Sequence, residues 1–231
     1  MNLKQNYPVV ISIEGNIGSG KSTIMKYLSK HFDNFVKLQG DNIKICYLQE
    51  PVSKWTNFTD ESGKNIIEKY YSDQKKYAFQ FQMMAYISRL SQFKQAITDG
   101  YDIIFTERSM FTDRNVFAKM LYNDKKIEEI EYKIYNAWFD EFAECLNNMK
   151  IYYIKTNPEI CFKRIEKRNR KGEENIPLDY LKSCSKYHDE WLDSFEKKIV
   201  LNGNIDISEN IYNENKYFNE MANNIYLLIK S

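Results

Sequence analysis

The sequence lacks the features that mark membrane, nucleic-acid-binding and disulfide-stabilised proteins. No apolar run approaches the length of about 18 residues that a membrane-spanning helix needs. Lysine and arginine number 33 against 32 aspartates and glutamates, so the net charge of +1 offers no basic field to nucleic acid. The four cysteines, Cys46, Cys145, Cys161 and Cys184, form no C-x-x-C pair, which indicates thiols in a reducing compartment. We therefore expect a cytoplasmic protein with neither a membrane nor a nucleic-acid partner.

Linkers and repeats are also absent from the sequence, and we expect no targeting segment. Only 8 glycines and 4 prolines occur in 231 residues, and no stretch rich in Gly, Pro or Ser divides the chain. The first apolar run begins at Val9, which leaves no room for a signal or transit peptide. The length suits one α/β domain of ordinary size. We therefore expect a single domain over residues 1–231.

Short apolar runs alternate with amphipathic stretches along the whole chain. The runs predict strands at Val9–Ile13, Ile43–Gln49, Tyr101–Thr106, Ile151–Lys155 and Ile199–Leu201. The stretches between and after them predict helices at Ser22–Phe32, Ile66–Thr98, Phe111–Tyr122, Ile127–Met149, Pro158–Arg168, Pro177–Lys197 and Asn213–Ile229. This alternation predicts an α/β protein with a five-stranded parallel sheet and helices on both faces. The polar insertion at 168–175 is interpreted as a lid loop.

A phosphate-binding motif follows the first predicted strand directly. The segment Gly15-Asn16-Ile17-Gly18-Ser19-Gly20-Lys21-Ser22 fits the pattern Gly-x4-Gly-Lys-Ser/Thr, and a predicted helix comes after it. The glycines let backbone N–H groups surround a phosphate, and the helix N-terminus adds its positive dipole end. Lys21 is expected to reach the β- and γ-phosphates, and the Ser22 hydroxyl to ligate Mg²⁺. The motif therefore predicts binding of a nucleoside triphosphate.

Charged residues follow the next two predicted strands. Because ligands of open α/β sheets gather beyond the carboxyl ends of the strands, Glu50 is a candidate general base for an attacking hydroxyl. Glu107 is a candidate Mg²⁺ ligand, and Arg108 a candidate to clamp phosphate or to orient Glu50. Two plainer interpretations stay open here: a surface glutamate before a proline turn, and a buried structural ion pair.

Two further groups of residues predict contacts with substrate. Arginines of the lid region are expected to stabilise charge on a transferring phosphoryl group, the alternative being a solvated basic face; they are Arg164, Arg168 and Arg170. On the long predicted helix, Gln82, Ala85 and Arg89 share one face, with Phe81 beside them. This face is suited to reading the edge of a nucleobase, although core packing explains it as well.

Read together, these motifs resemble the deoxynucleoside kinase family over nearly the whole chain, from Ile11 to about Trp191. The resemblance rests on matches in the right order: Gly-Asn-Ile-Gly-Ser-Gly-Lys-Ser-Thr from Gly15, Glu50-Pro51-Val52 with Trp55, Phe81-Gln82 with Ser88-Arg89, Glu107-Arg108-Ser109, the lid arginines, and Ile176-Pro177-Leu178-x-Tyr180-Leu181. It implies the P-loop kinase fold, ATP as phosphate donor, Mg²⁺, and a small-molecule deoxynucleoside as acceptor.

The resemblance also implies a role for each site residue. Glu50 would be the general base on the 5′-hydroxyl, with Arg108 paired to it. The 3′-hydroxyl would be held by Tyr71 and Glu173. The nucleobase would pair with Gln82 between Phe81 and Phe117, in an apolar pocket closed by Trp55 and Ile67. On the donor side, the phosphate loop from Gly15 to Thr23 would bind ATP. Within it, Lys21, Ser22 and Thr23 would serve ATP and magnesium, and Glu107 would help with the metal. The phosphates would be closed in by Arg164, Arg168 and Arg170.

Three pocket positions predict the preferred base. Family members that accept cytosine or purines carry Ala, Arg and Asp there, as this chain does at Ala85, Arg89 and Asp113. The Arg–Asp pair would deprive the 5-methyl group of thymine of apolar contact, a discrimination of about 1–3 kcal/mol. We therefore expect deoxycytidine or a purine deoxynucleoside to be preferred over thymidine.

Two alternative functions and the state of assembly stay open from the sequence. A nucleoside-monophosphate kinase of the thymidylate type shares the fold and the phosphate loop, and a catalytically silent relative could serve as an assembly subunit. The family is typically homodimeric through paired helices. The predicted helix Ile127–Met149 offers a suitable apolar stripe, Ile130, Ile134, Trp138 and Phe142, which core packing explains nearly as well.

Overall fold

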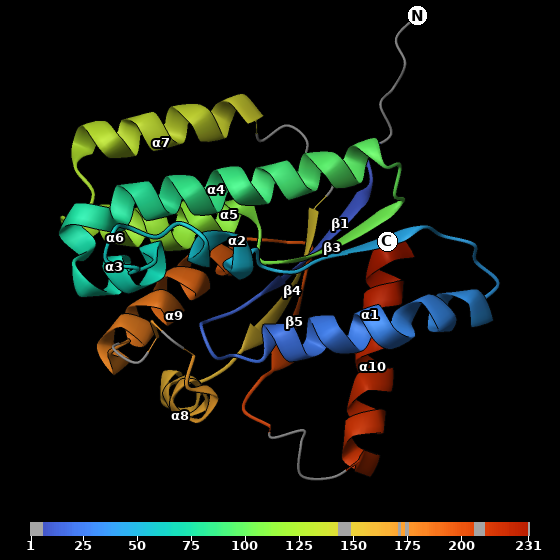
Figure 1. Ribbon diagram of the computed structural model, residues 1–231. Coiled ribbons are helices and arrows are strands. Elements are labelled where there is room, and N and C mark those ends of the chain that lie inside the picture. Colours follow the sequence, from blue (N-terminus) through green and yellow to red (C-terminus); the bar gives the residue numbers. More distant parts are fainter. Residues whose placement is uncertain (1–6, 143–148, 171, 174–175, 206–210, 231) are drawn as a thin grey trace, which may run out of the picture.

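A five-stranded, entirely parallel sheet forms the centre of the protein (Figure 1). The computed structural model describes residues 7–142, 149–170, 172–173, 176–205 and 211–230, with the side chains of 211–216 excepted. The strands are β1 (Val9–Glu14), β2 (Ile45–Leu48), β3 (Ile103–Glu107), β4 (Met149–Lys155) and β5 (Lys198–Asn202), in the order β2-β3-β1-β4-β5. The predicted fold class, an α/β P-loop kinase fold with a five-stranded parallel sheet, is confirmed.

Helices cover both faces of the sheet, which explains why its central strands are apolar on both sides. On one face, α1 (Lys21–Leu38) and α10 (Ile211–Lys230) pack over Ile11, Ile13 and Phe105. The alternate residues of β1 and β3, such as Val10 and Ile104, face the opposite core. That second core is contributed by α4 (Gln74–Thr98), α7 (Glu129–Phe142) and α9 (Leu178–Asp193).

Smaller helices complete the fold around the carboxyl ends of the strands. They are α2 (Val52–Thr56), α3 (Ile66–Ser72), α5 (Met110–Thr112), a π-helical segment η1 (Asp113–Ala118), α6 (Lys119–Asn123) and α8 (Pro158–Arg168). Of these, α2 was missed by the sequence analysis, and α5, η1 and α6 replace one predicted helix. None of the helices among the described residues has the length and apolar character needed to span a bilayer.

Two long helix predictions were wrong in their extent. The predicted helix Ile66–Thr98 is divided at Asp73, whose backbone (φ −150°, ψ 83°) leaves the helical region and whose carboxylate accepts a hydrogen bond from the Lys76 N–H to cap α4. The predicted helix Ile127–Met149 also fails at its end, because Met149 is the first residue of β4. Residues 143–148, in between, and Cys145 with them, lie outside the described part of the chain.

Candidate active site

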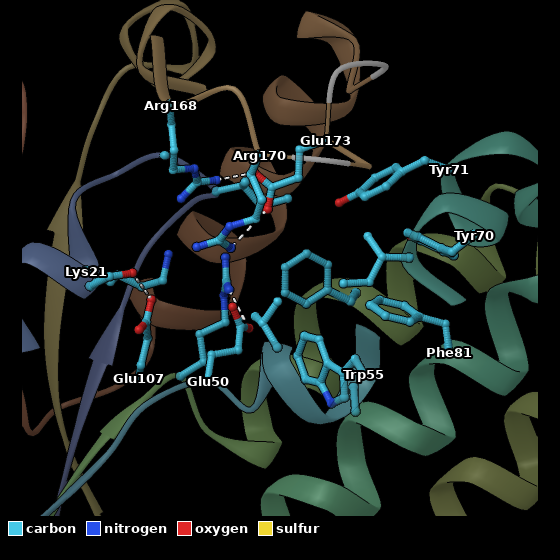
Figure 2. Close-up of a pocket in the computed structure, with 18 of the residues that line it drawn as sticks. Lys21, Glu50, Trp55, Tyr70, Tyr71, Phe81, Glu107, Arg168, Arg170 and Glu173 are labelled. Carbon is cyan, nitrogen blue, oxygen red and sulfur yellow. Dashed lines mark hydrogen bonds and ion pairs between the residues drawn. The ribbon is translucent and has the colours of Figure 1, made fainter. Parts of the chain in front are cut away.

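A cavity of about 350 Å³ lies beyond the carboxyl ends of β1, β2 and β3. Figure 2 shows charged side chains gathered on one side of it and aromatic ones on the other. Most of the predicted site residues line it: Ile17, Gly18, Gly20, Lys21, Ser22, Thr23, Glu50, Trp55, Ile67, Tyr71, Phe81, Gln82, Ala85, Glu107, Arg108, Asp113, Phe117, Arg164, Arg168, Arg170 and Glu173. The exceptions, Gly15, Asn16, Ser19 and Arg89, are not part of the lining.

The phosphate loop leads from β1 into α1, with its glycines in backbone conformations that disfavour a side chain. Gly18 has φ +77°, and a Cβ there would lie 2.6 Å from the Cys161 carbonyl oxygen. Within the loop, Lys21 Nζ donates to the Asn16 carbonyl at 2.7 Å. Asn16 itself donates through Nδ2 to the Leu181 carbonyl at 2.8 Å. Asn16, which is absent from the lining, therefore shapes the loop from behind.

Lys21 is a buried cation at the centre of this loop. Burial lowers its pKa to about 8, and repulsion from Arg108 acts in the same direction, while Glu107 and Glu50 raise it in part. The Ser19 hydroxyl is also buried and has no hydrogen-bond partner among the described residues. A loop with an under-neutralised ammonium group and a free hydroxyl is suited to hold an anion.

A hydroxyl and a carboxylate meet at the base of the cavity. Ser22 Oγ donates to Glu107 Oε1 at 2.7 Å, which joins the first residue after Lys21 to the end of β3. Hydroxyl and carboxylate oxygens are the donors that Mg²⁺ takes from proteins, usually one or two of them with phosphate and water completing the set. The pair therefore fits a magnesium ion held jointly by protein and nucleotide.

Glu50, which follows β2, projects into the cavity between two arginines. Arg108 Nη1 donates to its Oε1 at 2.8 Å and Arg89 Nη2 to the same oxygen at 3.3 Å. Burial alone would raise the pKa of Glu50, but the charges of Arg108, Arg89 and Lys21 outweigh it and lower that pKa to about 2. Glu50 is therefore an ionised carboxylate, and the surface position considered from the sequence is wrong.

Arg89 is a buried ion-pair partner behind the cavity wall. Its Nε donates to Asp113 Oδ2 at 2.9 Å, and its Nη1 to the Glu107 carbonyl at 2.7 Å. Asp113, from η1, lines the cavity, and burial raises its pKa although Arg89 opposes the shift. The one-residue widening of a π-helix is a frequent feature of functional sites. Here η1 carries both Asp113 and Phe117 to the cavity.

The opposite side of the cavity is aromatic, with one polar atom left open. Trp55 and Phe81 meet edge to face at 5.6 Å, and Tyr70 stacks on Phe81 at 4.5 Å between ring centroids. Gln82 is 2% exposed, and its Oε1 has no hydrogen-bond partner in the part of the chain that the structure describes. An unpaired buried amide oxygen at a cavity wall is suited to accept a hydrogen bond from a ligand.

Three lining residues were not predicted: Val52, Tyr70 and Tyr180. The hydroxyls of Tyr70 on α3 and Tyr180 on α9 lie 2.9 Å apart. Their positions beside Tyr71 and inside the Ile176–Leu181 motif were the available signal. The contact between α3 and α9 could not be read from the sequence, because it depends on how the two helices pack.

The lid residues that the structure describes close the remaining side. Glu173 forms ion pairs with Arg168 and, at 3.2 Å, with Arg170. In Figure 2 the Tyr71 side chain points into the cavity on the side where Glu173 lies. Arg164 differs from the other two arginines because it donates to backbone carbonyls, those of Gly203 at 2.9 Å and Ile205 at 3.1 Å.

Comparison with known proteins identifies the family. A family model described as deoxynucleoside kinase matches residues 11–230. Deoxycytidine kinase 2 of Gallus gallus is 35% identical over 193 residues, which cover 79% of this chain and 73% of that protein. Human deoxycytidine kinase is 32% identical (79% and 74% covered), and human mitochondrial thymidine kinase 2 is 34% identical (79% and 64%). These matches favour the predicted function over both alternatives. The chain is therefore a phosphotransferase that acts on a hydroxyl group of deoxynucleosides, and it belongs to the deoxynucleoside kinase family.

Proposed function

We propose that this enzyme transfers the γ-phosphate of ATP directly to the 5′-hydroxyl of a deoxynucleoside, with Glu50 as the general base. The position of Glu50 carries the proposal: an ionised carboxylate held by Arg108 and Arg89 in the same cavity as the phosphate loop. A carboxylate with a pKa of about 2 is a weak base before the reaction begins. Because the transition state is loose, the proton leaves late, when the oxygen has become acidic through its bond to phosphorus. Glu50 therefore first orients the hydroxyl and then accepts its proton.

The donor side of the proposal rests on the phosphate loop. Backbone N–H groups from Gly15 to Thr23 and the start of α1 would hold the phosphates of ATP, with Lys21 at the β- and γ-phosphates. Anionic oxygens would remove the penalty that burial places on the Lys21 charge. Ser22 and Glu107 would hold Mg²⁺, with Thr23 beside Ser22 on the nucleotide side. When bound there, Mg²⁺ neutralises charge on the phosphate oxygens.

Arginines of α8 and the lid would complete the phosphate site. Arg168, the last residue of α8, and Arg170, in the lid (about 168–175), line the cavity and would stabilise the equatorial oxygens of the phosphoryl group. Their ion pairs with Glu173 would have to loosen as the phosphates bind. Arg164, tied to the carbonyls of Gly203 and Ile205, would act mainly by shaping the donor side.

The acceptor side would recognise the sugar and the base separately. Tyr71 and Glu173, on the same side of the cavity, would hold the 3′-hydroxyl. The base would lie against Phe81 and Phe117, with Trp55 and Ile67 closing the pocket and the open Oε1 of Gln82 accepting a hydrogen bond. An exocyclic amine supplies such a donor, as on cytosine and adenine.

Base preference would follow from the buried Arg89–Asp113 pair beside Ala85. Asp113 presents a carboxylate at the cavity wall, and Arg89 fixes it from behind at 2.9 Å. A thymine methyl group directed at this pair would find no apolar contact. We therefore propose deoxycytidine or a purine deoxynucleoside as the preferred substrate over thymidine.

We further propose that the enzyme is a cytoplasmic homodimer. Three apolar residues on one side of α7 are exposed: Ile130 at 62%, Ile134 at 41% and Trp138 at 50%. On the other side of the helix, Tyr135 and Phe139 face the core. Core packing therefore does not account for these three residues, although it does account for Phe142, the fourth residue of the stripe, which is half-buried against the core. Ile87 on the neighbouring α4 is 54% exposed. The free thiols of Cys46, Cys161 and Cys184 suit a reducing compartment. Replacing Trp138 by Glu should shift the sedimentation coefficient to that of a monomer.

A kinetic panel tests the proposed reaction. Initial rates with ATP and each of the four deoxynucleosides, and with the corresponding monophosphates, give kcat/KM for eight acceptors under one set of conditions. We expect phosphorylation of nucleosides and none of monophosphates, with the highest kcat/KM for deoxycytidine or a purine deoxynucleoside. A highest value with thymidine would refute the base preference, and turnover of monophosphates alone would refute the reaction.

A further inference from the structure

One buried carboxylate beside the active site has no part in the proposed chemistry. Glu14 is the last residue of β1 and directly precedes the phosphate loop; it is 0% exposed. Its hydrogen-bond donors are three hydroxyls: Ser12 at 2.5 Å and Ser109 at 2.9 Å to Oε1, and Thr112 at 2.6 Å to Oε2. Burial raises the pKa of Glu14, against the opposing effect of these hydroxyls and of Arg108. Burying an acidic group has a large desolvation cost, which the three hydroxyl donors offset here.

The hydroxyls of Ser109 and Thr112 belong to the segment that follows Arg108, and this segment needs fixing. Arg108 has φ +63°, a left-handed conformation that is unfavourable for a residue with a Cβ. Neighbouring residues hold Arg108 in this conformation. The Arg108 N–H donates to the Ile13 carbonyl at 3.1 Å, and Thr106 Oγ1 donates to the Arg108 carbonyl at 2.7 Å. This backbone turn points the guanidinium at Glu50, 2.8 Å away.

We propose that Glu14 is a positioning residue that holds Arg108 against Glu50 by anchoring the hydroxyls of Ser109 and Thr112. The inference rests on the proposed function, in which Glu50 receives the acceptor hydroxyl. A carboxylate is suited to this task because its two oxygens accept from all three hydroxyls at once. Because Glu14 is bonded covalently to Gly15, the same contact sets the spacing between the phosphate loop and the acceptor carboxylate.

The two sets of hydroxyls around Glu14 provide a matched comparison. Ser109→Ala with Thr112→Val removes the donors that connect Glu14 to the Arg108 segment. Ser12→Ala removes a donor to the same carboxylate, but this donor lies on β1, the strand that carries Glu14 itself. We expect the double variant to lower kcat at least about tenfold while KM for ATP changes less than about twofold. Ser12→Ala should leave kcat within about twofold of the unmodified enzyme. Equal losses of kcat in the two would overturn the proposal.

A second measurement separates positioning from general stability. In an Arg108→Met background, Glu50 keeps its contact with Arg89, so residual turnover is measurable. If Glu14 acts through Arg108, Ser109→Ala should lower kcat about tenfold in the unmodified enzyme and by less than about twofold in this background. Effects that multiply fully would overturn the proposal. Ser109→Ala removes the bond to Glu14 and the longer contacts by which Ser109 Oγ caps α5 at Thr112, at 3.3 and 3.4 Å. It replaces the double variant if thermal unfolding shows that the latter does not fold.

The proposed function has its own mode of failure in this set. If Glu50→Gln and Arg108→Met both keep full turnover, the assigned chemistry is wrong. If both lose turnover while the Ser109 and Thr112 variants do not, the chemistry stands and only the role of Glu14 fails. Glu14→Gln, which keeps the shape with one acceptor oxygen fewer, should reproduce the loss of kcat seen for Ser109→Ala with Thr112→Val.

Discussion

The two halves of the cavity are built in different ways: the phosphate loop, which is the proposed donor half, and the pocket of the proposed acceptor half. The donor half is a run of consecutive residues, Gly15 to Thr23, whose glycines adopt left-handed backbone conformations and whose partners are mostly backbone atoms. The acceptor half is assembled from side chains on α2, α3, α4, η1 and the lid, which together span more than a hundred positions of the sequence, from Val52 to Glu173. Both meet at the ends of β1, β2 and β3.

This difference follows from what each half has to recognise. A phosphate group presents equivalent oxygens, and backbone N–H groups around a glycine-rich turn satisfy them without any specific side chain. A nucleoside presents a different donor, acceptor or apolar surface on each side, and only side chains from several directions match all of them. Substitutions should therefore affect the donor half through the backbone and the acceptor half through charge and shape.

The largest effect is expected where the two halves meet, at Glu50. Glu50→Gln keeps the volume but removes the charge that Arg108 and Arg89 hold in place. Losing a general base lowers turnover by about 10²–10⁴-fold. We expect kcat for deoxynucleoside phosphorylation to fall about 10³-fold in a coupled assay of ADP release. The thermal unfolding midpoint should fall as well, because the two arginines lose their charged partner. Retention of full turnover would contradict the assignment of Glu50.

The next largest effect tests whether the donor half works through its backbone. Gly18→Ala places a Cβ 2.6 Å from the Cys161 carbonyl oxygen at φ +77°. The left-handed conformation alone costs about 1–2 kcal/mol for a residue with a side chain, and the overlap adds to that cost. We expect KM for ATP to rise about 10- to 100-fold, with KM for the deoxynucleoside nearly unchanged.

Gly40→Ala is the matched control for this substitution. Gly40 has φ +83°, and no atom lies within 4 Å of the position of a Cβ. It therefore carries the same backbone penalty without the overlap and away from the cavity. Its KM for ATP should equal that of the unmodified enzyme, while its unfolding midpoint falls. If the two variants behave alike, the backbone account of the donor half is wrong.

The same contrast explains what the sequence allowed us to predict. The five parallel strands and the phosphate loop were predictable because each is encoded locally, by β-branched runs and by glycines at fixed spacing. Glu50, Glu107 and Arg108 were predictable as neighbours because parallel strands bring their carboxyl ends to one edge of the sheet.

Tertiary packing decided what could not be predicted. Asp73 interrupts a continuous helical pattern, because its carboxylate caps α4. Arg89 was expected in the pocket lining but is not part of it; its guanidinium is paired with Asp113, which η1 carries to the cavity. Tyr70 and Tyr180 are separated by 110 positions and meet only when α3 packs near α9. Periodicity reports which face of a helix is apolar, and it does not report what that face will contact.

A third prediction concerns base preference in the acceptor half. Arg89→Met with Asp113→Ala removes both members of the buried pair. Glu50 loses its contact with Arg89 but keeps the shorter one with Arg108. We expect the ratio of kcat/KM for thymidine to that for deoxycytidine to rise about 10- to 100-fold, in line with about 1–3 kcal/mol for one apolar contact. Arg114→Met with Asp140→Ala breaks a surface pair of similar length, 3.0 Å, and should leave the ratio unchanged. An unchanged ratio in the buried double variant would remove Arg89 and Asp113 from the account of specificity.

The last prediction concerns stability, with the smallest effect on activity, and is made for His188 behind the acceptor half. Its ring is fully buried and meets Phe117 edge-on at 6.3 Å, and Nδ1 lies 2.7 Å from the Cys184 carbonyl oxygen. Burial lowers its pKa to about 3. His188 binds a proton near pH 6.5 in the unfolded chain but not in the folded one. Its contribution to the free energy of unfolding is therefore complete above pH 6.5 and is lost as the pH falls towards 3. Between pH 7 and pH 5 the loss is about 2 kcal/mol.

Urea unfolding at these two pH values measures that contribution. His188→Asn keeps a donor for the Cys184 carbonyl but cannot titrate, so the difference in unfolding free energy between pH 7 and pH 5 should shrink by about 2 kcal/mol. His31→Gln, at an exposed position on α1, should leave that difference as it is in the unmodified enzyme. A pH dependence identical in all three proteins would show that His188 does not impose this cost.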